Sequence, residues 1–276
     1  MLSLDMIRSE DLPTESRLLS DPKESMDSRN LLNVLDVDFL SISMDEALAI
    51  MDRVVLEQRK ESVFFINADC LNISVKDPDY LRILNSQRIV LPDGAGISIA
   101  CRMIGERLAA NLNGTDLLPP LCEISAKNNY SMFLLGAEPG VAERMQRNLE
   151  ADYPGMKVVG QQHGYFDHDE QTTEIIEKIN ALKPNIVLVA FGAPRQEKWI
   201  YQHLDQLDAN LLIGVGGLFD FYSGDKKRAP IWMRKTGIEW LYRLYLEPGR
   251  LWRRYIIGNP LFVYRVFRWK SKRQIR

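Results

Sequence analysis

The chain has 276 residues, of which 46% are hydrophobic and 26% are charged, and its formal net charge is −2. These values are ordinary for a soluble globular protein of one or two domains, and the chain contains no internal repeat or low-complexity tract. Its three cysteines form no Cys-x-x-Cys pair, which argues against a zinc site or disulfide framework and for a reducing compartment. Residues 1–30 lack the apolar stretch of a signal peptide. The most membrane-like segment, 255–264, is far shorter than the roughly 20 residues of a spanning helix.

Residues 1–32 are rich in Ser, Asp and Glu and show no periodicity, so we expect a mostly disordered leader. Apolar runs of strand length and helical patterns alternate after it. The expected strands are 62–67, 88–91, 131–137, 157–162, 185–192 and 210–217. The expected helices are 43–60, which opens with the capping-box spacing of Ser43 and Glu46, and 95–105, 115–128, 139–152, 171–182 and 194–207.

This alternation predicts an α/β fold, a Rossmann-like, mostly parallel sheet with helices on both faces. We assign residues 33–231 to this core and residues 232–276 to a C-terminal basic, amphipathic helical appendage. Ligands bind at the carboxyl ends of the strands in open α/β sheets. The loops that follow the six strands are therefore where a site is expected, and five of the six contain glycine, which allows close approach of a ligand.

The net charge hides an asymmetry along the chain. From Lys226 to Arg276 there are fifteen Lys or Arg residues and two acidic ones, a net charge of +13, whereas the rest of the chain carries −15. A basic segment that is also rich in aromatic residues indicates an anionic partner, either a membrane surface or a nucleic acid. The simpler alternative is a solvated basic helix.

Two amphipathic patterns lie within this basic segment. Residues 237–247 form the first, which ends at Pro248 and Gly249, and a second follows over residues 250–256. Basic side chains on one face and Trp, Tyr and Leu on the other are typical of a helix that lies in a membrane interface. The same arginines could reach the diphosphate of a lipid or of a nucleotide.

Several common kinds of site are missing from the sequence. The glycine-rich stretches 94–99 and 214–219 lack dinucleotide-binding spacing, and there is no Gly-x-Ser-x-Gly elbow or Walker A motif. The three histidines lack metal-ligand spacing. The Asp-x-Asp tripeptides at 36–38 and 167–169 do not follow strongly apolar strands, and we interpret them as loop acids. We therefore expect no cofactor and no bound metal.

Asp93 lies in the stretch RIVLPDGAGI, between a predicted strand and a predicted helix. Two interpretations are open. Aspartate is a good N-cap residue, so the carboxylate could simply cap the helix that begins near Ala95. Alternatively, a carboxylate at the end of a strand, with Gly94 and Gly96 allowing close approach of a substrate, could act as a general base.

The stretch FGAPRQEKW, residues 191–199, suggests an anion site. Pro194 suits the first turn of a helix, and Arg195 and Gln196 then lie where backbone N–H groups favour a phosphate. An exposed helix start is the alternative. The segment 214–230 adds a second glycine loop followed by basic residues, and the two segments together suit a nucleoside diphosphate leaving group.

Five motifs together resemble the WecG/TagA/CpsF glycosyltransferases, also called glycosyltransferase family 26. They are LPDGAGI, NGTDLL, FGAPRQEKW, GVGGLFDFYSGDKKRAP and GIEWLYRLYLEPGRLWRRY, in this order, and the resemblance runs from about Asp36 to about Tyr264. It implies a peripheral enzyme on the cytoplasmic face of the bacterial inner membrane. Such an enzyme moves a sugar from a UDP-sugar to an acceptor sugar on undecaprenyl diphosphate for cell-surface polysaccharide synthesis. The resemblance further implies inversion of the anomeric centre, no metal, and a donor sugar that is N-acetylmannosamine, its uronic acid or glucose.

The resemblance also implies roles for individual residues. Asp93 matches the base that deprotonates the acceptor hydroxyl, Asn67 matches an asparagine of the pocket, and Gln196 is expected near the donor diphosphate or sugar. These three are the predicted catalytic residues. The basic appendage is expected to close over the site at the membrane. The predicted substrate-binding residues are Gly94, Gly114, Thr115, Asp116, Gly192, Arg195, Glu197, Gly216, Gly217, Arg228, Arg243, Arg250 and Arg253.

Two positions depart from the family pattern and leave the donor sugar open. Phe65 stands where a threonine is frequent, and Asn111 stands where an arginine is frequent. If that arginine steadies a phosphate, Arg107 or an arginine of the appendage must replace it. The alternatives are another UDP-sugar enzyme of soluble type or a nucleic-acid-binding protein that uses the basic tail. The glycosyltransferase interpretation expects no nucleic acid partner and leaves a homo-oligomer open.

Overall fold

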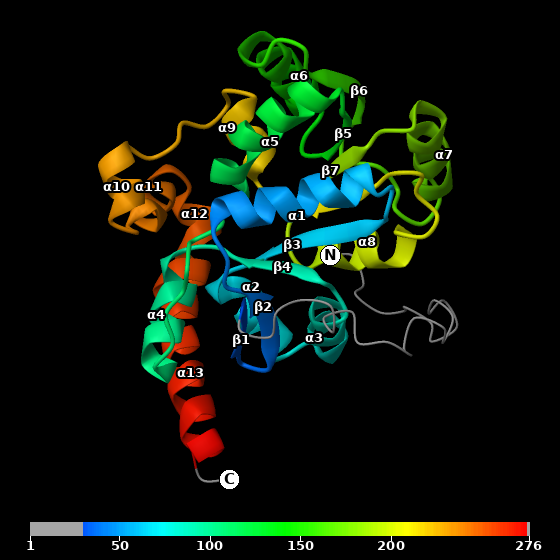
Figure 1. The fold of residues 1–276 in the computed structure, drawn as a ribbon. Helices are drawn as coiled ribbons and strands as arrows, with labels where there is room; N and C mark the ends of the chain where they lie inside the picture. Colours follow the sequence, from blue (N-terminus) through cyan, green and yellow to red (C-terminus); the bar gives the residue numbers. More distant parts are fainter. Residues whose placement is uncertain (1–29, 275–276) are drawn as a thin grey trace.

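The computed structural model describes residues 30–274, which fold around a six-stranded sheet (Figure 1). The strand order is β4-β3-β8-β7-β5-β6, and every paired strand in this sheet is parallel to its neighbour. All six predicted strands are present, and the predicted α/β class is confirmed. The strands are β3 (Glu61–Ile66), β4 (Ile89–Pro92), β5 (Ser131–Gly136), β6 (Lys157–Gln162), β7 (Ile186–Ala190) and β8 (Leu211–Gly214).

Helices cover both faces of the sheet. Successive strand residues point to opposite faces, so β3 gives Val63 and Phe65 to one hydrophobic core and Phe64 and Ile66 to the other. This double burial explains why the strands read as unbroken apolar runs. The first core is closed by α1 (Met44–Leu56), α5 (Gly114–Asn128) and α6 (Val141–Asp152). The second is closed by α2 (Ala68–Ser74), α3 (Pro78–Asn85), α4 (Ala95–Ile104), α7 (Thr172–Leu182) and α8 (Arg195–His203).

The predicted capping box at the start of α1 is confirmed. The Ser43 hydroxyl accepts from the Glu46 backbone N–H at 3.2 Å, and the Glu46 carboxylate accepts from the Ser43 N–H at 2.8 Å. The helix ends at Leu56, four residues before the predicted end, and Gln58 just beyond it has a positive φ of 52°.

In the part of the chain before β4, the sequence prediction missed three short segments. The first is a hairpin of β1 (Leu31–Val34) and β2 (Val37–Leu40), which precedes α1. The predicted leader, residues 1–32, therefore overlaps the first strand. Residues 1–29 of that leader lie outside the described residues. Asp36 lies in the hairpin turn, as predicted, but Asp38 lies in β2 and not in a loop. Helices α2 and α3 are the other two; each is at most eight residues long, too short to show a helical period in the sequence.

The C-terminal part is helical, as expected for the appendage. It consists of α10 (Ile231–Lys235), α11 (Glu239–Leu246), α12 (Pro248–Trp252), a π-helical segment (Arg253–Ile257) and α13 (Gly258–Gln274). The first amphipathic pattern ends at Leu246, just before Pro248, as predicted. Helix α13 continues from the π-helical segment without interruption and contains Pro260 just after this junction. Across the described residues 30–274, the helices are too short or too polar to cross a membrane.

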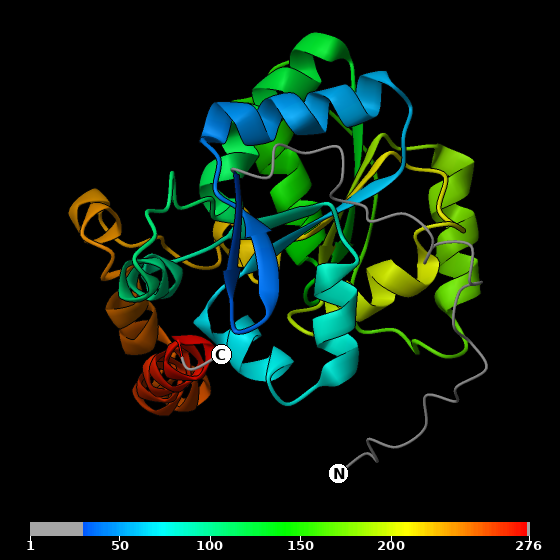
Figure 2. The same ribbon diagram turned by 60° about the horizontal axis from the view of Figure 1, so that its bottom comes forward.

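Helix α13 runs beside α2 and α4, and its C-terminal turns extend away from the sheet (Figures 1 and 2). The Asn72 side chain of α2 donates to the Gly258 carbonyl at 2.8 Å, and Arg265 donates to the Asn72 carbonyl and side chain, both at 2.8 Å. Phe262 and Val266 are buried in the second core. The structure therefore fixes α13 beside α2 and α4, at the end of the sheet that carries β4.

Candidate active site

A cavity of about 560 Å³ opens at the carboxyl ends of four neighbouring strands, β4, β3, β8 and β7. The loops after these strands form its floor, and the appendage helices α11 and α13 with the π-helical segment form its outer wall. The glycine loops after β5 and β6, which the sequence also offered as site loops, do not line it. Strand order decides this, since β5 and β6 lie at the far edge of the sheet.

Asp93 follows β4 directly and points into this cavity. Its backbone N–H donates to the Ile66 carbonyl at 2.7 Å, which continues the β3–β4 pairing past the end of the strand. The residue at the N-cap of α4 is Gly94, with φ of 90°, and no side chain caps that helix. The carboxylate of Asp93 therefore does not serve as the helix cap, which was one of the two interpretations of the sequence.

The surroundings of Asp93 make its carboxylate more basic than an ordinary one. Burial raises the pKa of Asp93, and the nearby charges of Arg243 and Arg254 and a hydrogen bond from Asn67 offset only part of that effect. A carboxylate with a raised pKa, held among cations in a cavity, has the properties of a general base.

Asn67 is oriented by the helix that follows it. Its side-chain oxygen accepts from the backbone N–H groups of Asp69 and Cys70, at 3.0 and 3.1 Å, and so caps α2. Because the oxygen is occupied there, the amide N–H group is the part that meets Asp93. The sequence placed Asn67 in the site but gave no sign of this capping role.

Gln196 lines the floor of the cavity, although its side chain is almost fully buried. Its side-chain oxygen accepts from the N–H groups of Gly192 and Gly216, at 3.1 and 2.9 Å, and its amide nitrogen donates to Glu197 at 2.8 Å. Glu197 is completely buried and does not line the cavity. Burial raises the pKa of Glu197 to about 7, despite the hydrogen bond from Gln196 that lowers it.

Five arginines line the cavity, and the sequence predicted three of them, Arg228, Arg243 and Arg250. The other two are Arg234 and Arg254. Predicted Arg195 is exposed at the start of α8, and predicted Arg253 is exposed with its guanidinium over the ring of Trp252, so neither lines the cavity. Arg107 is also exposed and does not line the cavity. Arg107 and the appendage arginines were the two possible replacements for the family arginine whose position Asn111 occupies. Only the appendage arginines reach this cavity.

Acidic side chains already hold four of the five arginines. Arg254 lies 3.4 Å from Asp69, and Arg228 lies 2.6 Å from Asp116, which also holds Arg234 at 3.6 Å. Burial of Asp116 works against its ionisation, but the hydrogen bonds from Arg228 and Asn113 outweigh it and lower its pKa. Asp116 itself, although predicted as a substrate-binding residue, does not line the cavity.

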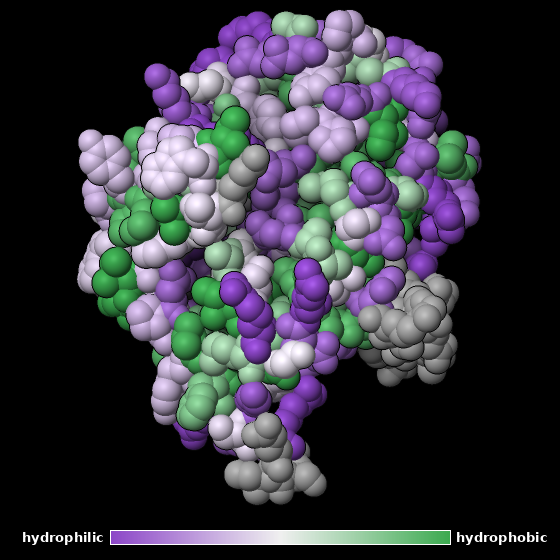
Figure 3. Space-filling view, turned by 60° about the vertical axis from the view of Figure 1, so that its left-hand side comes forward, coloured by the Kyte–Doolittle hydropathy of each residue, from purple (hydrophilic) through white to green (hydrophobic). Residues whose placement is uncertain are grey.

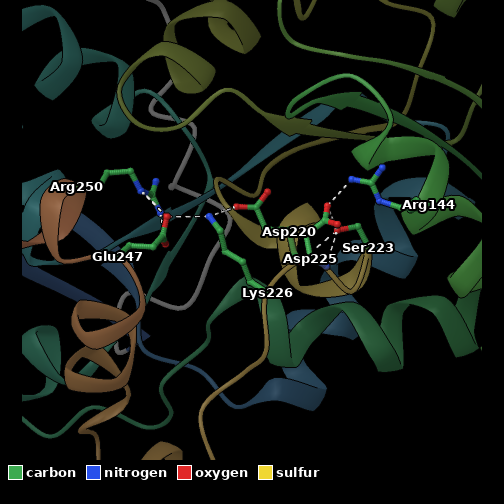
Figure 4. Close-up of polar contacts among 7 residues, drawn as sticks. All are labelled: Arg144, Asp220, Ser223, Asp225, Lys226, Glu247 and Arg250. Carbon is green, nitrogen blue, oxygen red and sulfur yellow. Dashed lines mark hydrogen bonds and ion pairs between the residues drawn. The ribbon is translucent and has the colours of Figure 1, made fainter.

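Arg250 belongs to a chain of charges that joins the appendage to the core (Figure 4). It donates to both carboxylate oxygens of Glu247, at 3.0 and 2.7 Å. Lys226 donates to Glu247 at 2.9 Å and to Asp220 of α9 (Leu218–Tyr222) at 2.6 Å. Helix α9 was not predicted from the sequence.

Arg243 differs from the other four. Within residues 30–274 no carboxylate lies within ion-pair distance of it, and its guanidinium stacks over the Phe221 ring at 5.4 Å. It also lies near Gly217 and acts electrostatically on Asp93. A cation between a base and a glycine loop suits an anionic group that must lie next to the reacting atoms.

The two positions that depart from the family pattern are both in the cavity. The Asn111 side-chain oxygen accepts from the Gly94 N–H at 2.5 Å, so this residue fixes the loop that carries Asp93. The ring of Phe65 packs against Gly114, where an added Cβ would lie 3.3 Å from it. Predicted Thr115 lies next to that glycine in the lining. The residues described contain no group of three or more His, Cys, Asp or Glu side chains that could hold a metal ion.

A cavity that contains a carboxylate of raised pKa beside a wall of arginines could receive a negatively charged substrate and deprotonate a hydroxyl of it. The chain belongs to the glycosyl transferase WecG/TagA/CpsF family, whose model matches residues 32–276. It is similar to the N-acetylglucosaminyldiphosphoundecaprenol N-acetyl-beta-D-mannosaminyltransferases of Staphylococcus aureus strains NCTC 8325 / PS 47, COL and MRSA252. Each is 31% identical over 247 residues, which cover 89% of this chain and 94% of the relative. The family predicted from the five motifs is confirmed.

Proposed function

We propose that this protein transfers N-acetylmannosamine from UDP-N-acetylmannosamine to an acceptor sugar on undecaprenyl diphosphate, with inversion at the anomeric carbon. The observation that carries the proposal is the position of Asp93, a carboxylate of raised pKa at the end of β4, beside the arginines of the cavity wall. Of the three donor sugars that the resemblance allows, the names of the relatives favour N-acetylmannosamine, and they also favour the undecaprenyl acceptor.

The proposed reaction is a single displacement. Asp93 takes the proton of the acceptor hydroxyl, and the oxygen attacks the anomeric carbon as the bond to UDP breaks. A single displacement inverts the configuration, so an α-linked donor gives a β-linked product, in keeping with the β-linkage in the names of the relatives. Asn67 supports this step by donating to the Asp93 carboxylate from a fixed direction.

In the proposed reaction, arginines of the cavity wall stabilise the negative charge that develops on the departing UDP. Arg243 is the best placed to receive it, because it lies near Asp93 and no carboxylate of the described chain neutralises it. Arg250 and Arg254 could add to this stabilisation if the diphosphate displaced Glu247 and Asp69 from them. Fixed cations that meet charge as it develops lower the barrier without a metal.

The acceptor lipid would reach the cavity from the appendage side. Large apolar side chains are exposed on these helices, and Figure 3 shows apolar side chains gathered on this side of the molecule. They are Ile231, Trp232, Leu241, Tyr245, Leu246, Trp252, Ile256, Ile257, Val263, Tyr264 and Phe267. Together with the +13 charge of residues 226–276, they suit a peripheral contact with the anionic cytoplasmic leaflet. The lipid diphosphate would then lie near the arginines.

The test is the substitution Asp93→Asn. We expect UDP to bind within a few-fold of wild type, while transfer falls by a factor of about 10²–10⁴, the usual contribution of a general base. Release of UDP is measured with UDP-N-acetylmannosamine and an undecaprenyl-diphosphate-linked N-acetylglucosamine acceptor, and titration calorimetry gives the affinity for UDP. Transfer at nearly the wild-type rate would reject Asp93 as the base. Parallel assays with UDP-glucose, UDP-N-acetylglucosamine and UDP-N-acetylmannosaminuronic acid identify the donor sugar.

A further inference from the structure

Two loops of the cavity floor are tied together by a single buried side chain. Gly192 follows β7 and Gly216 follows β8, and both have a positive φ, of 79° and 57°. Their N–H groups converge on the same oxygen of Gln196. These N–H groups are therefore bound within the protein and are not the ones that a phosphate would use. What Gln196 provides is a fixed separation between the two loops.

A glycine leaves the space that the Gln196 side chain occupies. Its side chain packs against Gly214 at the end of β8, where an added Cβ would lie 3.0 Å from the amide nitrogen of Gln196. Any larger residue at this position would push the side chain away from the two loops. The amide of Gln196 is already engaged by Gly192, Gly216 and Glu197, which suits a positioning role better than the catalytic role expected from the sequence.

Glu197 decides which way round the Gln196 amide lies. A buried amide can rotate by half a turn, which would exchange its oxygen and its nitrogen. The Glu197 oxygen accepts from the amide nitrogen at 2.8 Å, so the amide oxygen must face the two glycines. The other Glu197 oxygen has no hydrogen-bond partner among the described residues, and the same residues offer it no Lys or Arg within ion-pair distance. Burying a carboxyl group so poorly satisfied costs free energy, which a purely structural site would avoid.

We propose that Gln196 and Glu197 are positioning residues for the donor. Gln196 clamps the Gly192 and Gly216 loops at the separation that receives the nucleotide diphosphate, and Glu197 holds the amide of Gln196 in the orientation that this clamp needs. The substrate class, a nucleoside diphosphate sugar, rests on the proposed function. The clamp itself rests only on the hydrogen bonds described.

Four variants of the full-length chain test the proposal. Gln196→Met and Glu197→Met remove the hydrogen bonds while keeping the length of the side chain, and a double variant combines them. Glu197→Gln keeps an oxygen that can accept from Gln196 and is the conservative control. UDP affinity is measured by titration calorimetry, and the exchange rates of the Gly192 and Gly216 amide hydrogens are measured by NMR in the absence of nucleotide. Thermal melting verifies that each variant is folded.

We expect Gln196→Met to weaken UDP binding at least tenfold and Glu197→Met at least threefold, with faster amide exchange at both glycines. Because the two side chains act as a unit, the double variant should match Gln196→Met within about twofold. Glu197→Gln should keep the UDP affinity and the amide exchange rates of the wild type. In turnover, KM for the donor should rise while KM for the acceptor stays the same, which a general loss of stability would not produce.

The amide-exchange measurement tests the clamp, and the UDP-affinity measurement tests its link to the proposed donor. Unchanged amide exchange at Gly192 and Gly216 in Gln196→Met would overturn the clamp, and wild-type UDP affinity in folded Glu197→Met would overturn the role of Glu197. If wild-type protein does not bind UDP, the proposed donor is wrong, and the exchange rates still decide whether the clamp exists.

Discussion

At the scale of single residues, the site depends on side chains that fix other side chains. Asn67 caps α2 and thereby turns its amide N–H toward Asp93, and Asn111 holds the Gly94 N–H. The carboxylate is thus positioned by two asparagines, of which the sequence predicted Asn67 as a site residue and marked Asn111 only as a departure from the family pattern. The same reasoning applies to Gln196, whose amide is directed by Glu197.

The pKa of Asp93 gives a prediction at this scale. Since catalysis needs the ionised carboxylate, kcat/KM should fall as the pH is lowered through a pKa above the ordinary aspartate value of about 3.9. Arg243 lowers this pKa, so Arg243→Gln should move the acid limb of the profile to higher pH. The measurement is kcat/KM against pH at constant ionic strength.

The matched control for that profile is Arg147→Gln, which removes an exposed arginine on α6 that does not line the cavity. Its acid limb should coincide with that of the wild type. An acid limb that stays in place in Arg243→Gln, or that moves to lower pH, would contradict the electrostatic coupling between Arg243 and Asp93.

At the scale of elements, carboxylates occupy arginines of the cavity wall, and one of them, Glu247, also joins the appendage to Lys226 of the core. Glu247, between α11 and α12, binds Arg250 with both oxygens and also receives Lys226. A carboxylate in this place competes with any phosphate for Arg250. The structure thus shows the arginine wall in a state where the protein supplies its own counter-anions.

Removing one of these anions should strengthen phosphate binding. We expect Glu247→Gln to bind UDP about two- to fivefold more tightly, because Arg250 becomes available. The loss of the partly exposed ion pairs should cost at most about 1 kcal/mol and lower Tm by about 2–4 °C. Calorimetry and thermal melting measure the two effects, and Glu177→Gln on the exposed side of α7 is the control. Weaker binding of UDP would mean that Glu247 instead organises Arg250 for the ligand.

At the scale of the whole molecule, the basic C-terminal region has two parts with different contacts. Helix α13 is packed on α2 and α4 through buried Phe262 and Val266. Helices α10 and α11 contain no fully buried side chain among those described, and they carry Trp232 and Tyr245 exposed. Deleting everything after Ile231 would therefore uncover the core, so surface substitutions are the better test of membrane binding.

We expect the triple variant Trp232→Ser, Tyr245→Ser and Phe267→Ser to lose binding to vesicles of phosphatidylglycerol and phosphatidylcholine. All three side chains are more than half exposed, so folding should be unaffected. The control is Tyr165→Ser, a similarly exposed aromatic in the loop after β6, which should float with the vesicles like the wild type. Flotation of the triple variant at the wild-type level would exclude this surface as the membrane contact.

Much of the fold could be read from the sequence because parallel strands buried on both faces are continuous apolar runs with glycine or polar residues after them. All six strands and Asp93 at the end of β4 were predicted on this basis. The hairpin and the short helices α2, α3 and α9 were not, since four to eight residues carry too little periodicity to be distinguished from loops.

What the sequence determined by itself is the family, the α/β class and the chemical character of the strand ends, since these follow from local pattern and motif order. The tertiary structure decided which four loops meet, because strand order depends on packing between distant segments. It also decided that Arg254 and not Arg253 lines the cavity. Both residues belong to the π-helical segment, where successive side chains point in different directions, and only the docking of the adjoining α13 against α2 and α4 fixes which of the two faces inward.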